Sequence, residues 1–194
     1  MPRETQFDID ETLQRAGEAF WAEGYEATSM SALLKSMGIQ KGSFYNTYGS
    51  KHEVYLRALE QYSTSRLQEL REFVGGKSSL EAIREHFEMI YEECVGPSGF
   101  RGCLIFNCAL ERAHTDREAQ AIVKRAVARH EALLAGWIRE GQANGEIPAS
   151  LDAASKAKGL MAFVVGMRVY SRSGADPQAV RTLLEQAMCL LDGA

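Results

Sequence analysis

The segment from Gln40 to Lys51 concentrates side chains that form hydrogen bonds or carry positive charge. Amide and phenol groups can bind the edges of bases, and lysine ammonium groups can bind phosphates. Although the 194-residue chain has a formal net charge of -4, no Asp or Glu occurs between Ala27 and His52. Affinity for DNA depends on cations that face the phosphates locally, so this segment predicts a DNA-binding surface. We expect the major groove and its flanking phosphates to be contacted by Gln40, Lys41, Gly42, Ser43, Tyr45, Asn46 and Tyr48, and the DNA backbone by Thr28, Ser29 and Lys51.

A short helix at about residues 28–37 is expected to precede this surface. Thr28 or Ser29 can cap it, because a hydroxyl oxygen accepts a hydrogen bond from the first turn. Met30, Leu33, Leu34 and Met37 give it one apolar face at helical spacing. Gly38 follows where the chain must reverse, and a positive φ is expected there because glycine adopts it without a steric penalty.

A second short helix, at about residues 40–46, is expected to present the DNA-binding side chains. A helix of this length is unstable alone, so Ile39 and Phe44 must anchor it in the core. Helix, glycine turn and short helix together indicate a helix-turn-helix of the kind that enters the major groove of DNA. An ordinary helical hairpin with solvated lysines is the alternative interpretation.

The segment from Phe100 to Glu111 is the best candidate for a ligand pocket. On a helix, Cys103, Asn107 and Glu111 would lie on one face, and such a polar column is costly to bury unless something binds it. Cys103 also lies near an expected helix N-terminus and near Arg101, which both favour the thiolate. The alternatives are that Cys103 is a small buried hydrophobe and that the apolar members are plain core. The predicted ligand-binding residues are Met89, Cys103, Phe106, Asn107, Glu111, Trp137, Phe163, Met167 and Tyr170.

Motifs for catalysis, metals and cofactors are missing from the sequence. It contains no G-x-S-x-G, no phosphate-binding glycine loop and no dinucleotide-binding fingerprint, so we expect neither an enzyme nor a cofactor. His86, His114 and His130 show no paired spacing, and the four cysteines form no C-x-x-C pair, so no metal site is predicted. A cytoplasmic protein with free thiols is expected.

Helix start signals recur along the whole chain and predict an all-α fold. A first helix is expected at about residues 10–22, before the two short helices of the motif. Capping patterns at Ser50, Ser78, Thr115, Asp152 and the pair Asp176-Pro177 predict five further helices. No segment alternates apolar and polar residues as a strand would, and no apolar run is long enough to span a membrane. We expect no signal peptide in the N-terminal residues.

A stripe of small residues suggests a place where two copies could meet. Ser155, Gly159, Ala162 and Gly166 recur at helical spacing and would let another helix approach closely. Packing within one chain is the alternative. The predicted dimer-interface residues are Ser155, Gly159, Ala162, Gly166, Leu183, Leu184, Ala187 and Leu191.

The stretch from Phe20 to Leu56 carries a series of recognisable motifs. They are Glu23-Gly24-Tyr25, Thr28-Ser29, Gly38-Ile39, Lys41-Gly42-Ser43, Phe44-Tyr45 and Ser50-Lys51. With these motifs in order, the first 60 or so residues closely resemble the DNA-binding domain of TetR-family transcriptional regulators. Two departures, Tyr48 where Phe is usual and Leu33-Leu34 for a common Ile-Ala pair, keep the core apolar.

This resemblance implies a domain organisation and a set of partners. It implies a three-helix DNA-binding domain at residues 1–49, followed by a larger helical ligand-binding and dimerisation domain at residues 50–194. The partners implied are a second copy of the chain, a palindromic double-stranded operator and a small-molecule inducer that releases the repressor. The Gly-Cys-Leu sequence at Gly102 also resembles electrophile-responsive members, so a repressor switched by thiol modification at Cys103 is an alternative. A helical ligand-binding protein or an enzyme without DNA function is a further alternative.

Overall fold

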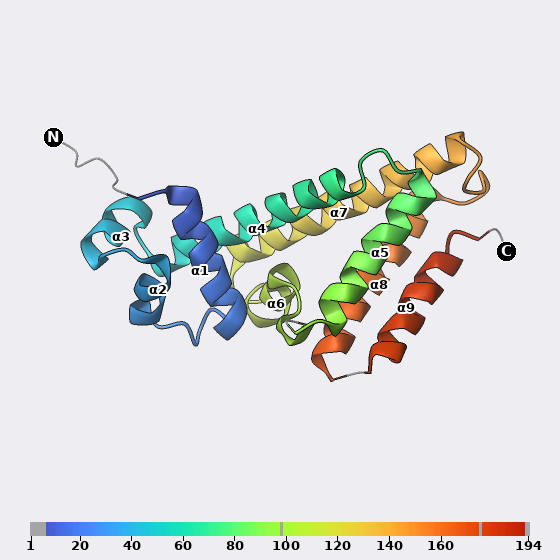
Figure 1. The fold of residues 1–194 in the computed structure, drawn as a ribbon. Helices are drawn as coiled ribbons and strands as arrows, with labels where there is room; N and C mark the ends of the chain where they lie inside the picture. The colour runs from blue at the N-terminus through green and yellow to red at the C-terminus, as the bar shows by residue number, and fades with distance from the viewer. Residues whose placement is uncertain (1–6, 98, 175, 193–194) are drawn as a thin grey trace. The chain divides into compact units, whose positions relative to one another are not determined.

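The fold is entirely helical in the part of the chain that the structure describes. The structure is a computed structural model and describes residues 7–97, 99–174 and 176–192. These residues contain no strand, so the prediction of an all-α fold is confirmed (Figure 1). The elements are α1 (Ile9–Glu23), α2 (Met30–Met37), α3 (Lys41–Tyr48), α4 (Lys51–Phe73), α5 (Ser79–Val95), the 3-10 helix η1 (Gly99–Arg101), α6 (Leu104–Glu111), α7 (Arg117–Ala143), α8 (Ala153–Arg172) and α9 (Pro177–Cys189).

Side-chain caps begin most helices where the sequence predicts them. The Ser50 hydroxyl accepts a hydrogen bond from the Glu53 amide at 3.1 Å, and Ser78 caps α5 in the same way. Asp152 and Asp176 accept from the third residue beyond them, which begins α8 and α9. Each cap satisfies an amide that the helix leaves unpaired, so these helices begin at defined residues.

The predicted start of α7 is wrong by one residue. Its N-cap is Asp116, whose carboxylate accepts a hydrogen bond from the Ala119 amide at 3.0 Å. The Thr115 hydroxyl instead donates to the Arg112 carbonyl oxygen at 3.2 Å, and Thr115 lies one residue before the N-cap. Aspartate adds a negative charge at the positive end of the helix dipole, which favours it over threonine at this position.

The described residues belong to two compact units. The first unit comprises Met1–Arg66 and Cys103–Lys124, and the second comprises Leu67–Gly102 and Arg125–Ala194. Both α4 and α7 contribute residues to each unit. The predicted boundary between residues 49 and 50 separates a DNA-binding domain from a ligand-binding and dimerisation domain. The two compact units are defined by packing and not by these roles, so the boundary stays a prediction.

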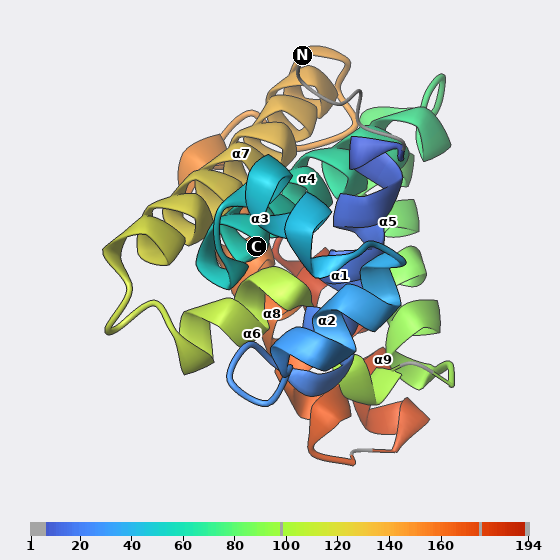
Figure 2. The same ribbon diagram turned by 90° about the vertical axis from the view of Figure 1, so that its left-hand side faces the viewer.

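Aromatic side chains form the core of the first unit. Phe20 of α1 contacts Tyr55 of α4 edge to face, with ring centroids 5.0 Å apart. Phe44 of α3 is fully buried, as its predicted role as an anchor requires, and Leu33 of α2 is buried too. In Figure 2, α1, α2 and α3 of this unit face the viewer, with α2 packed against α1. The short helix α3 is therefore held in place by tertiary contacts.

Helices α5, α8 and α9 pack together in the second unit. Ion pairs join them at their partly buried edges: Arg168 to Glu93, and Arg181 to Glu88 at 2.6 Å. His86 and His130 lie with their Nε2 atoms 2.8 Å apart. Burial, followed by the charge of Arg168, lowers the pKa of His130 to about 4, so its ring is neutral near pH 7. One hydrogen can then be shared between the two rings without charge repulsion.

Candidate nucleic-acid interface

The turn between α2 and α3 fixes the direction of the second helix. Gly38 adopts the left-handed conformation with φ of 69°, as predicted. Its amide donates to the Leu34 carbonyl oxygen at 3.0 Å and closes the end of α2. Ser29 caps the start of α2 by accepting from the Ala32 amide at 3.1 Å. Both ends of α2 are thus defined, and α3 begins at Lys41, three residues after the turn glycine.

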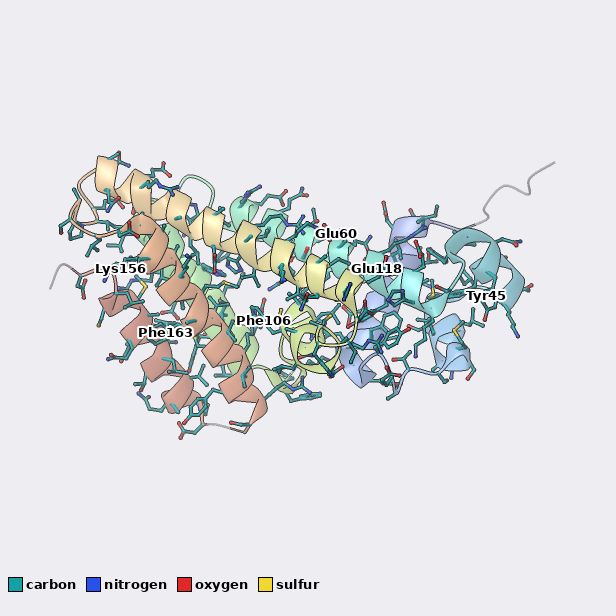
Figure 3. All side chains as sticks on the ribbon, turned by 180° about the vertical axis from the view of Figure 1, so that it is seen from behind. Tyr45, Glu60, Phe106, Glu118, Lys156 and Phe163 are labelled. Carbon is teal, nitrogen blue, oxygen red and sulfur yellow. The ribbon has the colours of Figure 1, made fainter. Side chains whose placement is uncertain are left out.

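Helix α3 has one buried face and one solvent-exposed face. Phe44 fills the core on the buried face. Tyr45, labelled in Figure 3, extends from the other side of the helix and is 44% exposed. The exposed residues predicted to contact DNA are Gln40, Lys41, Gly42, Ser43, Tyr45 and Asn46.

Two residues predicted to face DNA are buried instead, and those predictions are corrected. The Thr28 side chain is inaccessible, and its hydroxyl donates to the Gly24 carbonyl oxygen at 2.6 Å. The Tyr48 ring is buried beside Phe44, and its hydroxyl is hydrogen-bonded to Thr12 of α1. A tyrosine where phenylalanine is usual is explained by this partner, because a buried hydroxyl needs a hydrogen bond.

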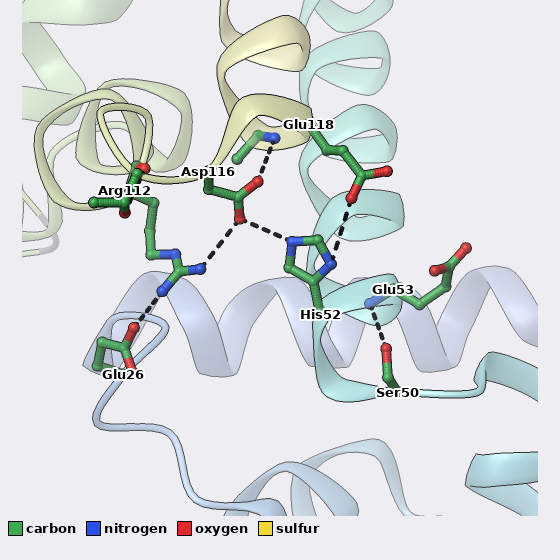
Figure 4. Close-up of polar contacts among 9 residues, drawn as sticks. Glu26, Ser50, His52, Glu53, Arg112, Asp116 and Glu118 are labelled. Carbon is green, nitrogen blue, oxygen red and sulfur yellow. Dashed lines mark hydrogen bonds and ion pairs between the residues drawn. The ribbon is translucent and has the colours of Figure 1, made fainter.

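A polar cluster joins the start of α4 to the connection between α6 and α7 within the first unit. We call it the Asp116 cluster. The Asp116 carboxylate lies 2.8 Å from Nε2 of His52 and 3.2 Å from Nη2 of Arg112, and Arg112 also pairs with Glu26 (Figure 4). Its six members are Tyr25, Glu26, Lys51, His52, Arg112 and Asp116.

Two cations lie over one aromatic ring of this cluster. Lys51 Nζ and Arg112 Cζ are each 4.3 Å from the centroid of the Tyr25 ring. Burial lowers the pKa of Lys51, although the nearby charge of Glu26 opposes this shift. Lys51 is half-buried here, so its predicted contact with the DNA backbone stays a prediction.

The electrostatics of the Asp116 cluster keep its central carboxylate ionised. Burial alone would raise the pKa of Asp116, but hydrogen bonds from the Ala119 amide, His52 and Arg112 lower it to about 2. A charge buried with several partners is costly to separate from them. The Asp116 cluster can therefore couple the position of the α6–α7 connection to the start of α4, which follows α3 after only two residues.

The predicted ligand-binding residues lie in both units. Cys103, Phe106, Asn107 and Glu111 belong to the first, and Met89, Trp137, Phe163, Met167 and Tyr170 belong to the second. Within the first unit, Glu111 is exposed and lies close to Gly24, so the expected buried polar column is not formed. The buried side chains of α6 are those of Leu104–Phe106 and Cys108, whereas Asn107 is only partly buried.

Exposure divides the other predicted ligand residues. Phe106 and Met167 are core residues, and Tyr170 is 47% exposed, so these three side chains do not share one environment. Trp137 lines two cavities in the second unit. The binding role of this set stays a prediction.

Cys103 occupies the N-cap position of α6 and is half-buried. The Tyr62 hydroxyl donates a long hydrogen bond to its sulfur at 3.7 Å. Cys94 and Cys108 are buried, and burial raises the pKa of both thiols. Of Cys94 in α5, Cys103 and Cys108 in α6, Cys103 is thus the accessible one.

Part of the predicted dimer surface serves packing within one chain. Leu184, Ala187 and Leu191 are buried because α9 packs against α5 and α8, so these three are corrected to core residues. Gly159 lies against Leu190 of the same chain. The remaining members, Ser155, Ala162, Gly166 and Leu183, are exposed or partly exposed and stay predictions as interface residues.

Sequence reasoning missed most of the Asp116 cluster. One available signal was the spacing of Arg112 and Asp116, four residues apart with opposite charge. His52 gave no signal of its own, because its partner is 64 residues away in the sequence. Among the described residues, no group of His, Cys, Asp or Glu side chains could hold a metal ion. None of the described helices is long and apolar enough to cross a membrane.

Comparisons with known proteins agree with this architecture. Residues 13–58 match the model of bacterial regulatory proteins of the tetR family, and residues 76–187 match that of the tetracyclin repressor-like C-terminal domain. The uncharacterized HTH-type transcriptional regulator YezE of Bacillus subtilis is 29% identical, and the alignment covers 99% of this chain and 100% of YezE. The transcriptional regulator AcuR of Cereibacter sphaeroides is 31% identical over 80% of this chain and 71% of AcuR.

A solved structure extends the comparison to a complex. A cysteine mutant of the TetR family transcriptional regulator CifR, complexed with 26bp double-strand operator DNA, is 26% identical with a TM-score of 0.82. That alignment covers 97% of this chain and 98% of the CifR chain. The glycine turn and the exposed face of α3 define the class of helix-turn-helix DNA-binding proteins. The chain belongs to the TetR family of bacterial regulatory proteins, and it is a DNA-binding transcriptional regulator rather than an enzyme.

Proposed function

We propose that the chain is a cytoplasmic, homodimeric repressor that leaves a palindromic operator when a small molecule binds to it. The observation that carries this proposal is the exposed face of α3. Six exposed polar, small or aromatic residues, from Gln40 to Asn46, lie around the buried side chains of Phe44 and Tyr48, on a helix fixed by the Gly38 turn. A short helix held rigidly with its hydrogen-bonding side chains outward can read base edges in the major groove.

Specific binding to the operator requires two copies of the chain. One α3 helix covers only a few base pairs, so a palindrome read by two symmetry-related copies is needed for specificity. CifR, one relative of known structure, is complexed with operator DNA. Each copy of α3 binds one half of the palindrome. A change in the distance between the two α3 helices would therefore weaken binding to both halves at once.

The Asp116 cluster supplies a path for the signal. Its members Arg112 and Asp116 belong to the α6–α7 connection, and Lys51 and His52 begin α4. A ligand that displaced this connection would break several charged contacts and shift the start of α4. To move the population from 1:99 to 99:1, the ligand must prefer the non-binding state by about 5.5 kcal/mol.

DNA binding is tested by fluorescence anisotropy with the DNA upstream of the protein's own coding region. Lys41→Ala should weaken binding to all sequences and flatten the log-log salt dependence by about one unit, because one phosphate contact is lost. Lys156→Ala on α8 is the matched control and should bind as the parent does. Tyr45→Ala should instead change which operator sequence is preferred. Parent-like binding by Lys41→Ala would contradict the assigned surface.

Thiol modification of Cys103 is a second candidate for the signal. It is favoured by the position of this cysteine, half-buried at the N-cap of α6, where added bulk would push against Tyr62.

A further inference from the structure

Two adjoining cavities lie in the second unit between the end of α4, the start of α5 and α7. The larger has a volume of about 440 Å³ and the smaller about 190 Å³. Arg71, Trp137 and Glu140 line both cavities, so we treat them as one site and call it the Trp137 groove. The size of the larger cavity falls in the range of small-molecule sites, about 300–1,000 Å³.

The apolar wall of the Trp137 groove is built on a packed core. Trp137 and Leu133 of α7 pack against a buried cluster formed by Leu70, Val74 and Ala82. The indole is therefore held in place before any ligand arrives, which lowers the entropy that binding must overcome. A fixed indole face offers a surface on which a planar aromatic ring can stack.

A glycine keeps the Trp137 groove open. Gly136 lies in the middle of α7, where glycine weakens a helix relative to alanine. A Cβ added to Gly136 would meet no atom within 4 Å, so packing does not explain the glycine. A larger side chain at this position would occupy the larger cavity, which Gly136 itself lines.

The polar lining of the Trp137 groove favours an anion. Arg71, Lys77 and Arg129 contribute three positive charges, against the single carboxylate of Glu140. Lys77 is paired with Glu81 and Glu85, whereas Arg71 makes no ion pair with any described residue. An arginine guanidinium binds a carboxylate through two parallel hydrogen bonds.

A buried hydroxyl also points to a ligand. Ser79 lines the smaller cavity and is 4% exposed, and its oxygen has no hydrogen-bond partner among the described residues. Buried hydroxyl groups in folded proteins are nearly always hydrogen-bonded, so an unpartnered one calls for a partner.

We propose that the Trp137 groove binds a small aromatic carboxylate. The aromatic ring stacks on Trp137 above Gly136, the carboxylate binds Arg71, and Ser79 donates a hydrogen bond on the side of the smaller cavity. The role of this ligand as the inducer rests on the proposed function, in which a small molecule releases the repressor from its operator.

Binding is tested by isothermal titration calorimetry of the full chain without DNA, with naphthoate as the probe and neutral naphthamide as its matched analogue. We expect naphthoate to bind one site per chain, and naphthamide to bind at least about tenfold more weakly because it lacks the charge. Absence of naphthoate binding, or equal binding of the two compounds, would overturn the proposal.

Two pairs of variants locate the site. Arg71→Gln should weaken naphthoate binding about tenfold, whereas Arg84→Gln, at a residue that lines neither cavity, should bind as the parent does. Gly136→Phe should abolish binding by filling the larger cavity, and Gly136→Ala controls for the change in the helix backbone. Because Arg71 is exposed, Arg71→Gln keeps the test valid even where Gly136→Phe fails to fold. Parent-like binding by Arg71→Gln would overturn the assignment.

Operator release separates this inference from the proposed function. We expect naphthoate to release the parent and Arg84→Gln from the operator at the same concentration, and to release Arg71→Gln only at about tenfold higher concentration. Operator binding that naphthoate does not change, in a protein that calorimetry shows to bind naphthoate, would overturn the inducer class while the site stands. Failure of the parent to bind any operator would instead overturn the proposed function.

Discussion

Asp116 illustrates how one buried carboxylate can organise contacts from three helices. It caps α7 through the Ala119 amide, accepts from Arg112 after α6, and contacts His52 at the start of α4. Each partner stabilises the ionised form, and together they outweigh the effect of burial on its pKa. Breaking any of these contacts leaves a charge with less compensation, so the group behaves as a unit.

The lowered pKa of Asp116 predicts a pH-dependent stability. Since its pKa is about 2 in the folded protein and near its ordinary value of 3.8 in the unfolded chain, it stabilises the fold above about pH 4. This contribution is lost as the pH falls towards the folded pKa. Asp116→Asn should therefore lower the free energy of unfolding near pH 7 by about 2 kcal/mol, and the difference from the parent should shrink below about pH 4.

Urea unfolding at a series of pH values measures this difference. Glu118→Gln is the matched control, because the Glu118 carboxylate is exposed and lies 3.9 Å from His52. Its loss should change the free energy of unfolding by less than about 0.5 kcal/mol. Equal effects of the two substitutions would contradict the central role of Asp116.

Cys103 can be tested against the non-covalent account of the signal. If the thiol is the sensor, N-ethylmaleimide should release the parent from operator DNA, and Cys103→Ser should resist release. The thiolate sulfur adds to one carbon of the reagent's double bond, the π bond breaks, and the other carbon takes a proton from water. The added group places bulk at the N-cap of α6. Cys189→Ser is the control, because Cys189 of α9 is exposed. Unchanged sensitivity of Cys103→Ser would leave non-covalent ligand binding as the account.

At the scale of elements, the α2–α3 turn sets the orientation of the reading helix. Gly38 has a φ of 69°, and a Cβ added there would lie 3.0 Å from an Arg15 nitrogen. Gly42, within α3, has nothing within 4 Å of an added Cβ. The two glycines of this motif therefore serve different needs: one permits the turn, and the other leaves space on the DNA-binding face.

Alanine substitutions should separate these two roles. Gly38→Ala should destabilise the protein by about 1–2 kcal/mol, because a left-handed conformation is unfavourable for a residue with a Cβ. Gly42→Ala should stabilise it by roughly 0.5–1 kcal/mol through helix propensity, yet weaken operator binding if the backbone approaches DNA closely. Thermal unfolding and anisotropy measure the two effects. A stabilised Gly38→Ala would show that the turn does not require glycine.

At the scale of the whole molecule, the exposed stripe of α8 predicts self-association. Ala162 is exposed within one chain, so Ala162→Glu should produce a folded monomer by placing charges against each other across a two-fold interface. Leu184→Glu should instead unfold the chain, because Leu184 is buried in its own protomer. Analytical ultracentrifugation and circular dichroism distinguish a monomer from an unfolded chain. A parent that sediments as a monomer at micromolar concentration would contradict the dimer.

The sequence by itself determined the helical elements and the motif that reads DNA. Serine and aspartate caps, the Gly38 turn and the apolar spacing of α2 act over a few residues, so their effects can be read locally. The anchoring role of Phe44 followed from the same pattern, because a helix as short as α3 needs a buried side chain. The order of these motifs was also sufficient to indicate the family.

Only the tertiary structure decided which polar and apolar residues work together. The sequence predicts that Tyr48 contacts DNA, but its hydroxyl is hydrogen-bonded to Thr12 on another helix. The sequence predicts that Leu184 lies in a dimer interface, but it is buried where α9 packs against α5. The partners of Asp116 and the lining of the Trp137 groove come from segments far apart in the sequence. Helical periodicity says which residues share a face, but it does not say what that face meets, because long-range packing is set by the whole chain.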